Sequence, residues 1–390
     1  MEKLGDLRPV WAEINLDNLK NNIKEIRRVV KEEAKVCAVI KADGYGHGAA
    51  EIAQTLLDNG ADRLAVATLS EGIQLRRKGI DASLLILGYT PEEQGKHLLD
   101  YNLIQTVYSL QQGKALSKIA EAENKHIKLH IKIDTGMSRL GLQANEDSVE
   151  IIEDLFKLPN VIVEGIYTHF AVADEVDKTY TWKQYNLFMG LVEALEAKGI
   201  FIPIKHVSNS AAIIDLPEMN LDMVRAGIML YGLYPSKEVN HQAVKLKQVM
   251  SLKARVSHVK MVEANQGISY GHIYKTSEKK QIITLPIGYA DGFTRMLTNK
   301  ATVTLKGKQI PIVGRICMDQ CMADASGIEV HQGDQVVLFG EDSDLYNTVD
   351  DVAEKLGTIN YEVVCMIGKR VPRVYLENNN LLHIKDSLLE

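Results

Sequence analysis

A lysine at the end of a predicted strand is the first residue in this sequence that has the position of a catalytic group. Lys41 follows the apolar run VCAVI, which begins at Val36, and precedes a turn containing Gly44, Gly46 and Gly48. A lysine that is partly desolvated in a barrel mouth loses preference for its ammonium form, and the neutral amine condenses with aldehydes. Position alone also fits a solvated lysine at a strand end, so the wider sequence has to decide.

A second cationic side chain is predicted to lie inside the fold. In KLHIKIDTGMSRLG, apolar residues alternate with polar and basic ones, so one face of this strand is apolar and the other is unusually basic. If the apolar face packs on helices, Lys132 points inward, where an ammonium is costly without a negative partner. A salt bridge from Lys132 to a carboxylate is one way to supply that partner.

The elements that would position these lysines repeat one theme. From about Val36 to about Tyr231, a short apolar strand is followed by a turn and an amphipathic helix. Eight such units predict an α/β fold of the (β/α)8 TIM-barrel type, whose active site lies at the C-terminal ends of the strands. The strands are expected to begin near Val36, Arg63, Leu84, Ile104, Lys128, Val163, Ile204 and Met223.

The pattern changes after about Lys245. Short alternating runs separated by glycine and charged turns predict a mainly antiparallel β domain, so we expect a barrel domain over 1–245 and a second domain over 246–390. One helix, TVDDVAEKLG, is expected with Thr348 as its cap and Gly357 at its end. Final strands are expected around TINYEVVCM and RVYLEN, and WAEIN, near residues 10–16, is an extra strand of either domain.

Composition narrows the class of function. A chain of 390 residues with 46% hydrophobic residues can build two domains, and no segment is apolar enough to cross a bilayer. The net charge of −6 comes from interspersed charges, which disfavours a nucleic-acid or membrane partner and favours small-molecule chemistry. The N-terminus lacks a secretory pattern, so a cytoplasmic location is expected. The four cysteines form no paired CxxC motifs, which predicts no disulfide framework or metal site, and Cys317 and Cys321 are expected to be buried thiols.

The segment around Lys41 resembles a known family. AVIKADGYGHG is similar to the cofactor-binding signature of the alanine racemases, which are fold type III pyridoxal-phosphate enzymes, and further blocks follow in the family's order. These blocks are IKIDTGMSRLG, THFAVAD, HVSNSAA, MVRAGIMLYG, GISYG, PIGYADGF, GRICMDQ and TINYEV. The resemblance implies interconversion of L- and D-alanine, which supplies D-alanine for peptidoglycan, with pyridoxal 5′-phosphate held by Lys41 as a Schiff base.

The resemblance also implies a second base. Tyr270 of GISYG matches the family's tyrosine on the face of the substrate opposite Lys41. Racemisation needs a group on each face, because a single base would return the proton to the side from which it came.

The remaining cofactor residues are implied in the same way. Arg225 matches the arginine that faces the pyridine nitrogen; because a guanidinium only donates hydrogen bonds, it would leave that nitrogen unprotonated and weaken the electron sink. A structural ion pair is the alternative role for Arg225. His169 matches a histidine that bonds to this arginine, although strand-end histidines are commonly core residues. The phosphate set is Tyr45, Asn209, Ser210, Gly227, Ile228 and Tyr361, with His206 expected to orient the same loop.

The substrate residues come from both predicted domains. The lysine matched by Lys132 is carbamylated in the family and holds the arginine matched by Arg139, which binds the substrate carboxylate. Met318 and Asp319 match a loop whose backbone N–H binds the same carboxylate, and Tyr289 matches a tyrosine at the entrance. In the family the second domain completes the neighbouring chain's active site, which implies a head-to-tail homodimer.

Three other functions fit part of the sequence. A fold type III decarboxylase would carry a glycine-rich phosphate loop in place of HVSNSAA and a CDSxD block in place of CMDQC. A racemase of broad range, or one for serine or lysine, shares all the motifs and differs in pocket volume. A non-catalytic pyridoxal-phosphate homeostasis protein would share the barrel but lack the second domain and Tyr270.

Overall fold

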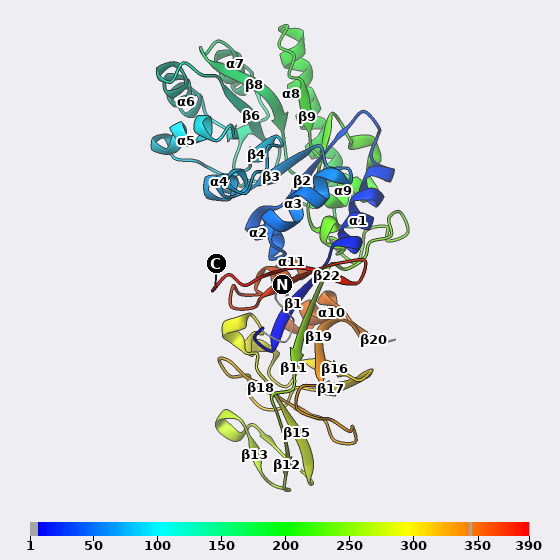
Figure 1. The fold of residues 1–390 in the computed structure, drawn as a ribbon. Coiled ribbons are helices and arrows are strands. Elements are labelled where there is room, and N and C mark those ends of the chain that lie inside the picture. The colour runs from blue at the N-terminus through cyan, green and yellow to red at the C-terminus, as the bar shows by residue number, and fades with distance from the viewer. Residues whose placement is uncertain (1–6, 343–344, 390) are drawn as a thin grey trace. The chain divides into compact units, whose positions relative to one another are not determined.

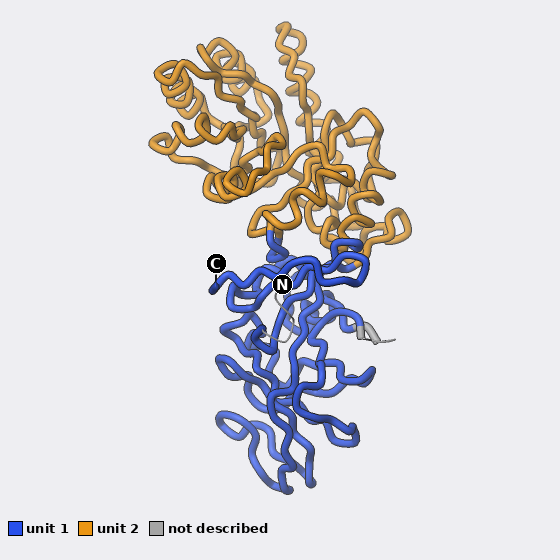
Figure 2. Tube along the Cα trace, in the orientation of Figure 1, with its two compact units in different colours: residues 1–18, 45–48, 248–390 blue, residues 19–44, 49–247 orange. Residues whose placement is uncertain are grey.

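The computed structural model describes residues 7–342 and 345–389, and the chain forms two compact units (Figure 2). Unit 1 contains residues 1–18, 45–48 and 248–390, and unit 2 contains residues 19–44 and 49–247. Within the described residues, no helix has the length and apolar character needed to cross a membrane.

Unit 2 is a parallel eight-stranded barrel surrounded by helices (Figure 1), which confirms the predicted (β/α)8 fold. The hydrogen-bonded order is β10-β2-β3-β4-β5-β6-β8-β9, and Arg225 N–H donates to the Ser208 carbonyl at 3.0 Å where β10 meets the chain after β9. All eight predicted strands form, with a short extra strand β7 (Leu142–Gln143) beside β6. The barrel strands are β2 (Lys35–Val39), β3 (Arg63–Val66), β4 (Leu84–Ile86), β5 (Ile104–Val107), β6 (Ile127–Asp134), β8 (Val161–Tyr167), β9 (Ile204–His206) and β10 (Met223–Ala226).

Several helices of unit 2 begin at side-chain caps that the sequence supplies. Thr68 and Glu71 form a capping box at the start of α4, and Ser109 caps α6 through its hydroxyl. Each helix buries one apolar side, as in α3, where Ile52 and Leu56 are fully buried. The helices are α1 (Leu16–Val29), α3 (Ala49–Asp58), α4 (Leu69–Arg77), α5 (Gly95–Asp100), α6 (Leu110–Ala122), α7 (Glu146–Phe156), α8 (Thr179–Ala197) and α9 (Ser210–Asp215), with 3₁₀ turns η2 (Glu92–Gln94), η3 (Pro217–Met219) and η4 (Ile228–Tyr231).

The turn after Lys41 is left-handed. Element α2 (Lys41–Tyr45) has φ near +52° at Ala42 and Asp43, and positive φ continues through Gly44, Tyr45 and Gly46. Such a conformation costs about 1–2 kcal/mol for each non-glycine residue, so the surroundings have to hold it. In unit 2, a Glu71 carboxylate oxygen accepts from the Ala42 N–H at 2.6 Å.

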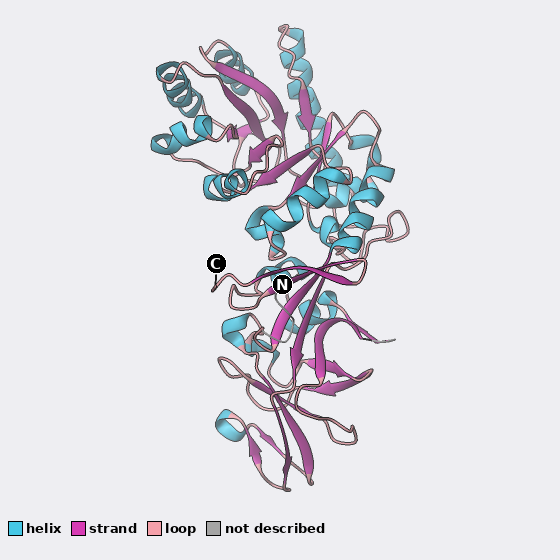
Figure 3. Ribbon diagram, in the orientation of Figure 1, coloured by secondary structure: helices cyan, strands magenta, loops and turns pink. Residues whose placement is uncertain are grey.

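Unit 1 is mainly antiparallel (Figure 3). Its largest sheet has the order β17-β16-β19-β11-β1-β21-β22, with β20 beside β19, and two smaller sheets have the orders β12-β15-β18 and β13-β14. The strands are β1 (Val10–Asn15), β11 (Met250–Arg255), β12 (His258–Val262), β13 (Gly267–Ile268), β14 (Tyr274–Lys275), β15 (Lys280–Leu285), β16 (Thr302–Leu305), β17 (Lys308–Pro311), β18 (Cys321–Asp324), β19 (Gln335–Asp342), β20 (Leu345–Asn347), β21 (Arg373–Glu377) and β22 (Asn380–Lys385).

The N-terminal strand, which the sequence left open between two domains, belongs to the unit 1 sheet. β1 pairs antiparallel with β11, where Ala12 lies opposite Leu252, and parallel with β21, where Ala12 lies opposite Arg373. Trp11 on this strand is 2% exposed and packs with Val374 and Ile384.

Helices and turns interrupt the sheets of unit 1. Helix α10 (Val349–Leu356) has the predicted Thr348 cap and ends at Gly357 in the left-handed conformation. The prediction of a strand around TINYEVVCM is wrong, because Asn360–Cys365 forms a short helix, α11. Its buried Val363 and Val364 pack against neighbouring elements that include α10, which overrides the strand propensity of valine. The 3₁₀ turns are η5 (Tyr270–His272), η6 (Tyr289–Asp291) and η7 (Arg295–Leu297).

Candidate active site

The chemistry-bearing residues of unit 2 gather at one end of the barrel. Lys41 follows β2, Arg139 follows β6, His169 follows β8 and Asn209 follows β9, while Arg225 lies near the end of β10. In a parallel barrel these are the C-terminal strand ends, where functional side chains from different strands can converge.

His169 lies at the same barrel end, and Arg225 Nη2 is 3.2 Å from its Nδ1. Desolvation, followed by the positive charges of Arg225, Arg139, Lys132 and Lys41, lowers the pKa of His169 well below its usual value. Its ring is therefore kept neutral by burial and by the positive charge at this barrel end. Such a concentration of positive charge favours a ligand that carries several negative groups.

Arg225 is held by a fixed set of acceptors. It is buried, and its two terminal nitrogens donate to the carbonyls of Thr168, His206 and Val207 and to ring nitrogens of His206 and His169 at 2.8–3.2 Å. Burial lowers the pKa of Arg225 to about 10, which keeps it cationic at neutral pH. Among the described residues no acceptor faces its Nε–H, so one donor remains for a ligand.

Behind Arg225, a directed chain of hydrogen bonds crosses the barrel interior. Because a guanidinium can only donate, His206 Nδ1 accepts from Arg225, and His206 Nε2–H then donates to His130 Nδ1 at 2.9 Å. His130 Nε2–H in turn donates to Glu164 at 3.1 Å, and Arg63 holds the same carboxylate at 2.5 Å. Desolvation lowers the pKa of both histidines, which favours these neutral forms.

Glu164 is the anion at the end of this chain. Its burial acts to raise the carboxyl pKa, but hydrogen bonds from His130 and Arg63 outweigh burial and the pKa is lowered. This role of His130 and Glu164 was not predicted from the sequence, and His206 was expected to orient the phosphate loop. The alternation in KLHIKI places His130 on the same face of the strand as Lys132, and this was the one indication in the sequence that His130 points into the barrel.

Lys132 lies inside the barrel with 3% of its surface exposed. Its Nζ donates to the Ile133 carbonyl at 2.5 Å and lies 5.5 Å from the centre of the Tyr167 ring. Burial and then the charge of Arg225 lower the pKa of Lys132 to about 7, although Asp134 opposes the shift. The alternative of a salt bridge is not seen, since no carboxylate of the described residues pairs with Lys132.

A small loop after β9 offers donors at the same barrel end. Ser210 Oγ accepts from the Gly227 N–H at 3.0 Å, and among the described residues no acceptor takes the Ser210 hydroxyl proton. Asn209 accepts from the Ala212 N–H at 3.1 Å and so begins α9. Ile228 follows at the start of η4 and is fully buried.

The two remaining members of the predicted phosphate set lie in unit 1. The Tyr45 and Tyr361 rings are tilted against one another with centroids 6.1 Å apart, and Tyr45 is 7% exposed. The chain at Gly46 is also fixed there, because its φ is +82° and a Cβ would lie 2.4 Å from the Val364 carbonyl oxygen. Arg373 donates to the Gly46 carbonyl at 3.1 Å.

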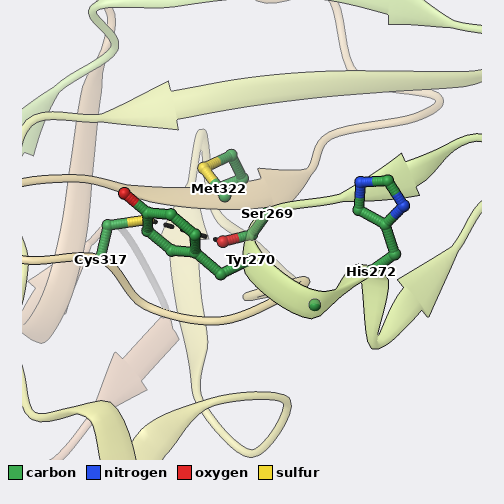
Figure 4. A pocket seen from close by; sticks show the side chains of 6 residues that line it. Ser269, Tyr270, His272, Cys317 and Met322 are labelled. Atoms are coloured by element: carbon green, nitrogen blue, oxygen red, sulfur yellow. Dashed lines mark hydrogen bonds between the residues drawn. The ribbon is translucent and has the colours of Figure 1, made fainter.

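Tyr270 stands on a strained turn beside a pocket of about 360 Å³ in unit 1 (Figure 4). The preceding Ser269 has φ +64° and ψ −172°, which non-glycine residues rarely adopt, and its hydroxyl donates to the Arg315 carbonyl at 2.6 Å. The Tyr270 side chain is 69% exposed. Cys317 and Met322 line the same pocket, and Cys317 is therefore only partly buried, which corrects the expected buried thiol; Cys321 is fully buried.

The Met318–Asp319 loop is fixed by the neighbouring turn η6. The N–H groups of Tyr289 and Ala290 donate to the carbonyls of Cys317 and Met318, each at 3.0 Å. No described residue accepts from the Met318 or Asp319 N–H, so both donors are open to a ligand. Tyr289 is 42% exposed and Met318 is 52% exposed.

The predicted site residues thus form two groups. Unit 2 holds those associated with the lysine and arginine cluster, namely Lys41, Lys132, Arg139, His169, Asn209, Ser210, Arg225, Gly227 and Ile228. Unit 1 holds Tyr45, Tyr270, Tyr289, Met318, Asp319 and Tyr361.

Comparison with known families places both units in one type of protein. The model of the alanine racemase N-terminal domain matches residues 14–235, and the model of the alanine racemase C-terminal domain matches residues 249–375. An alanine racemase of Clostridium tetani is 52% identical over 382 residues, which cover 97% of this chain and 98% of the relative. One from Methanococcus maripaludis is 53% identical over 369 residues, covering 94% and 99%.

Solved structures show the same similarity in three dimensions. The alanine racemase of Clostridium difficile 630 superposes with a TM-score of 0.95 at 49% identity and covers 98% of this chain and 100% of that one. The alanine racemase of Bacillus anthracis with bound L-Ala-P gives a TM-score of 0.93 at 37% identity, with 98% and 99% covered.

Proposed function

The chain belongs to the alanine racemase family, and from this premise we propose that it interconverts L- and D-alanine with pyridoxal 5′-phosphate as cofactor and two opposed bases. The observation that carries the proposal is the gathering of Lys41, Arg139, His169 and Arg225 at the C-terminal ends of the barrel strands. A site built in this way suits a ligand with a phosphate, a phenolate and a carboxylate.

The residues at the barrel end fit the cofactor. Lys41 would hold it covalently through Nζ, and the open Nε–H of Arg225 would donate to its ring nitrogen. The free hydroxyl proton of Ser210, with the backbone of Gly227 and Ile228 and the hydroxyls of Tyr45 and Tyr361, would serve the phosphate. When bound, the cofactor supplies an electron sink for the negative charge left on the α-carbon.

The two bases divide the proton transfers. Lys41 Nζ would take or return the α-proton on one face of the substrate, and the Tyr270 hydroxyl would do so on the other. Because Arg225 donates and stays cationic, the ring nitrogen would remain unprotonated, which would keep the electron sink weak and limit side reactions.

Lys132 is proposed to carry a carbamate. Reaction with carbon dioxide needs a neutral amine, and a pKa near 7 supplies one at physiological pH. The neutral amine nitrogen adds to the carbon of carbon dioxide and one proton leaves to solvent, so the neutral amine becomes an anion; a chain that starts with the ammonium form loses two protons in all. That anion would hold Arg139 for the substrate carboxylate. Intact mass in bicarbonate buffer would show one carbon dioxide on the chain, and an unmodified Lys132 would overturn the idea.

We also propose a homodimer in which unit 1 of each chain completes the barrel site of its partner. The support is the exposure of Tyr270, Tyr289 and Met318, which is high for large side chains with a catalytic or binding role. Mixing Lys41→Ala chains with Tyr270→Phe chains under subunit exchange tests it. If the site is shared between chains, the mixture should regain about a quarter of the wild-type activity, because about half of the dimers are mixed and each mixed dimer has one intact site. A site within one chain regains none.

The main experiment follows L-alanine in deuterated water, with L-serine and L-lysine in parallel. Loss of optical rotation together with α-deuteration identifies racemisation, and a preference for alanine separates this function from a broad, serine or lysine racemase. Borohydride reduction that labels a lysine other than Lys41, or exchange without inversion by the wild type, would refute the proposal. With this function we expect a cytoplasmic location and supply of D-alanine for peptidoglycan.

A further inference from the structure

Unit 1 contains a fully buried carboxylate that two arginines share. Asp291, the last residue of η6, accepts from both terminal nitrogens of Arg8 at 2.6 and 2.8 Å. Arg370 Nε lies 3.5 Å from the same carboxylate. A buried charge held by two cations strongly resists displacement, so it makes a firm anchor for the chain around it.

This anchor sets the shape of the turn that carries Tyr289. The second oxygen of Asp291 accepts from the Gly288 N–H at 3.1 Å, which closes the turn. A Cβ at residue 288 would lie 2.3 Å from the Cys317 carbonyl oxygen, so the turn and the loop over 317–319 touch through their backbones. The turn then holds the carbonyls of Cys317 and Met318.

Arg370 extends the anchor to the other side of the loop. Its Nη2 donates to Asp319 Oδ1 at 2.7 Å. One guanidinium therefore joins the buried Asp291 to the exposed Asp319, immediately beyond the open N–H of Met318. It also neutralises Asp319, whose charge would otherwise repel an incoming carboxylate at this loop.

We propose that Arg370 and Asp291 are positioning residues for the substrate carboxylate, holding the loop over 317–319 so that its open N–H groups are preorganised and its own carboxylate is neutralised. The inference deepens the proposed function, because it rests on binding of the amino-acid carboxylate at Met318. Neither residue touches the substrate in this scheme. Both set the affinity for the carboxylate rather than the transfer of the proton.

The test measures alanine racemisation and inhibition by propionate, a carboxylate without an amino group. Arg370→Gln is expected to raise the KM for alanine and the inhibition constant of propionate by a similar factor of about five, with kcat changed less than about twofold, as befits a partly exposed ion pair. Arg370→Lys keeps the charge and should recover part of the loss.

A double-mutant cycle isolates the contact. Adding Asp319→Asn to Arg370→Gln removes the unpaired charge, so the double variant should bind propionate better than Arg370→Gln alone. Lys306→Gln is the matched control, because Lys306 pairs with Asp334 at 2.8 Å elsewhere in unit 1, and it should leave both constants unchanged. Thermal unfolding checks that every variant is folded.

The inference is overturned if Arg370→Gln leaves both constants unchanged, if it lowers kcat alone, or if the double variant is no better than Arg370→Gln. Failure of the proposed function looks different, because wild-type protein would then neither racemise alanine nor respond to propionate.

Discussion

Arg225 donates to His206 Nδ1 across 2.9 Å, and this bond fixes the proton positions of two buried histidines. The direction follows from chemistry alone, since a guanidinium has no acceptor. The chain of hydrogen bonds ends at Glu164, so its negative end lies away from the barrel mouth. Its donor end, Arg225, faces the mouth.

Glu164→Gln should weaken the barrel by about 1–3 kcal/mol at pH 7, because it removes a partly buried anion that accepts hydrogen bonds from Arg63 and His130. The folded-state pKa of Glu164 is lowered, so its stabilisation is present above the unfolded value of about 4.3 and is lost as pH falls through the folded value. Denaturant unfolding from pH 7 to pH 3 should show the stability difference between the two proteins narrowing below about pH 4.3 without closing at pH 3, because the folded-state pKa lies well below that range. Glu153→Gln, which breaks exposed ion pairs, is the control, and equal losses in both variants would contradict the prediction.

Lys132→Met should stabilise the protein in bicarbonate-free buffer at pH 6 by about 1–4 kcal/mol, because it removes a buried ammonium. The folded pKa is about 7 and the unfolded value is about 10.4, so wild-type stability should rise with pH between them and the advantage of methionine should shrink. Denaturation across that range measures the effect. Lys118→Met, a change at an exposed lysine, should show no such pH trend. A stability difference between Lys132→Met and the wild type that does not change with pH would argue against a buried amine.

Tyr270→Phe should lower racemisation by about 10²–10⁴-fold in both directions, since one of two opposed bases is lost. The remaining base still reaches one face, so one enantiomer should keep exchanging its α-proton with solvent while the other stops. Proton NMR in deuterated water follows both enantiomers. Tyr274→Phe, on nearby β14, should behave as wild type, and loss of exchange from both enantiomers alike would rule out the division of labour.

Ser269 offers a test of backbone strain. Ser269→Ala and Ser269→Gly both lose the hydrogen bond to the Arg315 carbonyl, but only glycine relaxes at φ +64°. The glycine variant should therefore be more stable than the alanine variant by about 1 kcal/mol. Denaturant unfolding compares them, and an alanine variant of equal or greater stability would show that the turn is not strained.

The barrel could be predicted from sequence because its signal is local and repeated. Each strand is a short apolar run followed by a turn, so periodicity finds all eight. The prediction failed around Val363 for a related reason. The apolar run over 363–367 fits a strand or a buried helix equally, and packing decides between them.

The site was less accessible to sequence reasoning. Motif resemblance supplied Lys41, Arg225 and Tyr270 as candidates, but the chain from His206 to Glu164 depends on which strands are neighbours and in which register. The hydrogen bond from the Ala42 N–H to Glu71 was equally hard to predict. The sequence indicates that Glu71 can take part in a capping box, but it does not indicate that Glu71 also contacts the turn after Lys41.

The pairing of β1 with both β11 and β21 makes the order of synthesis matter. Strand β1 leaves the ribosome before any barrel strand, yet its parallel partner at Arg373–Glu377 is made only after all of them. The apolar residues of β1 therefore lack this partner strand until the barrel sequence between them has been translated. A product that stops short of Arg373 would carry every barrel strand and still expose one edge of β1, which marks prematurely terminated chains for aggregation or degradation.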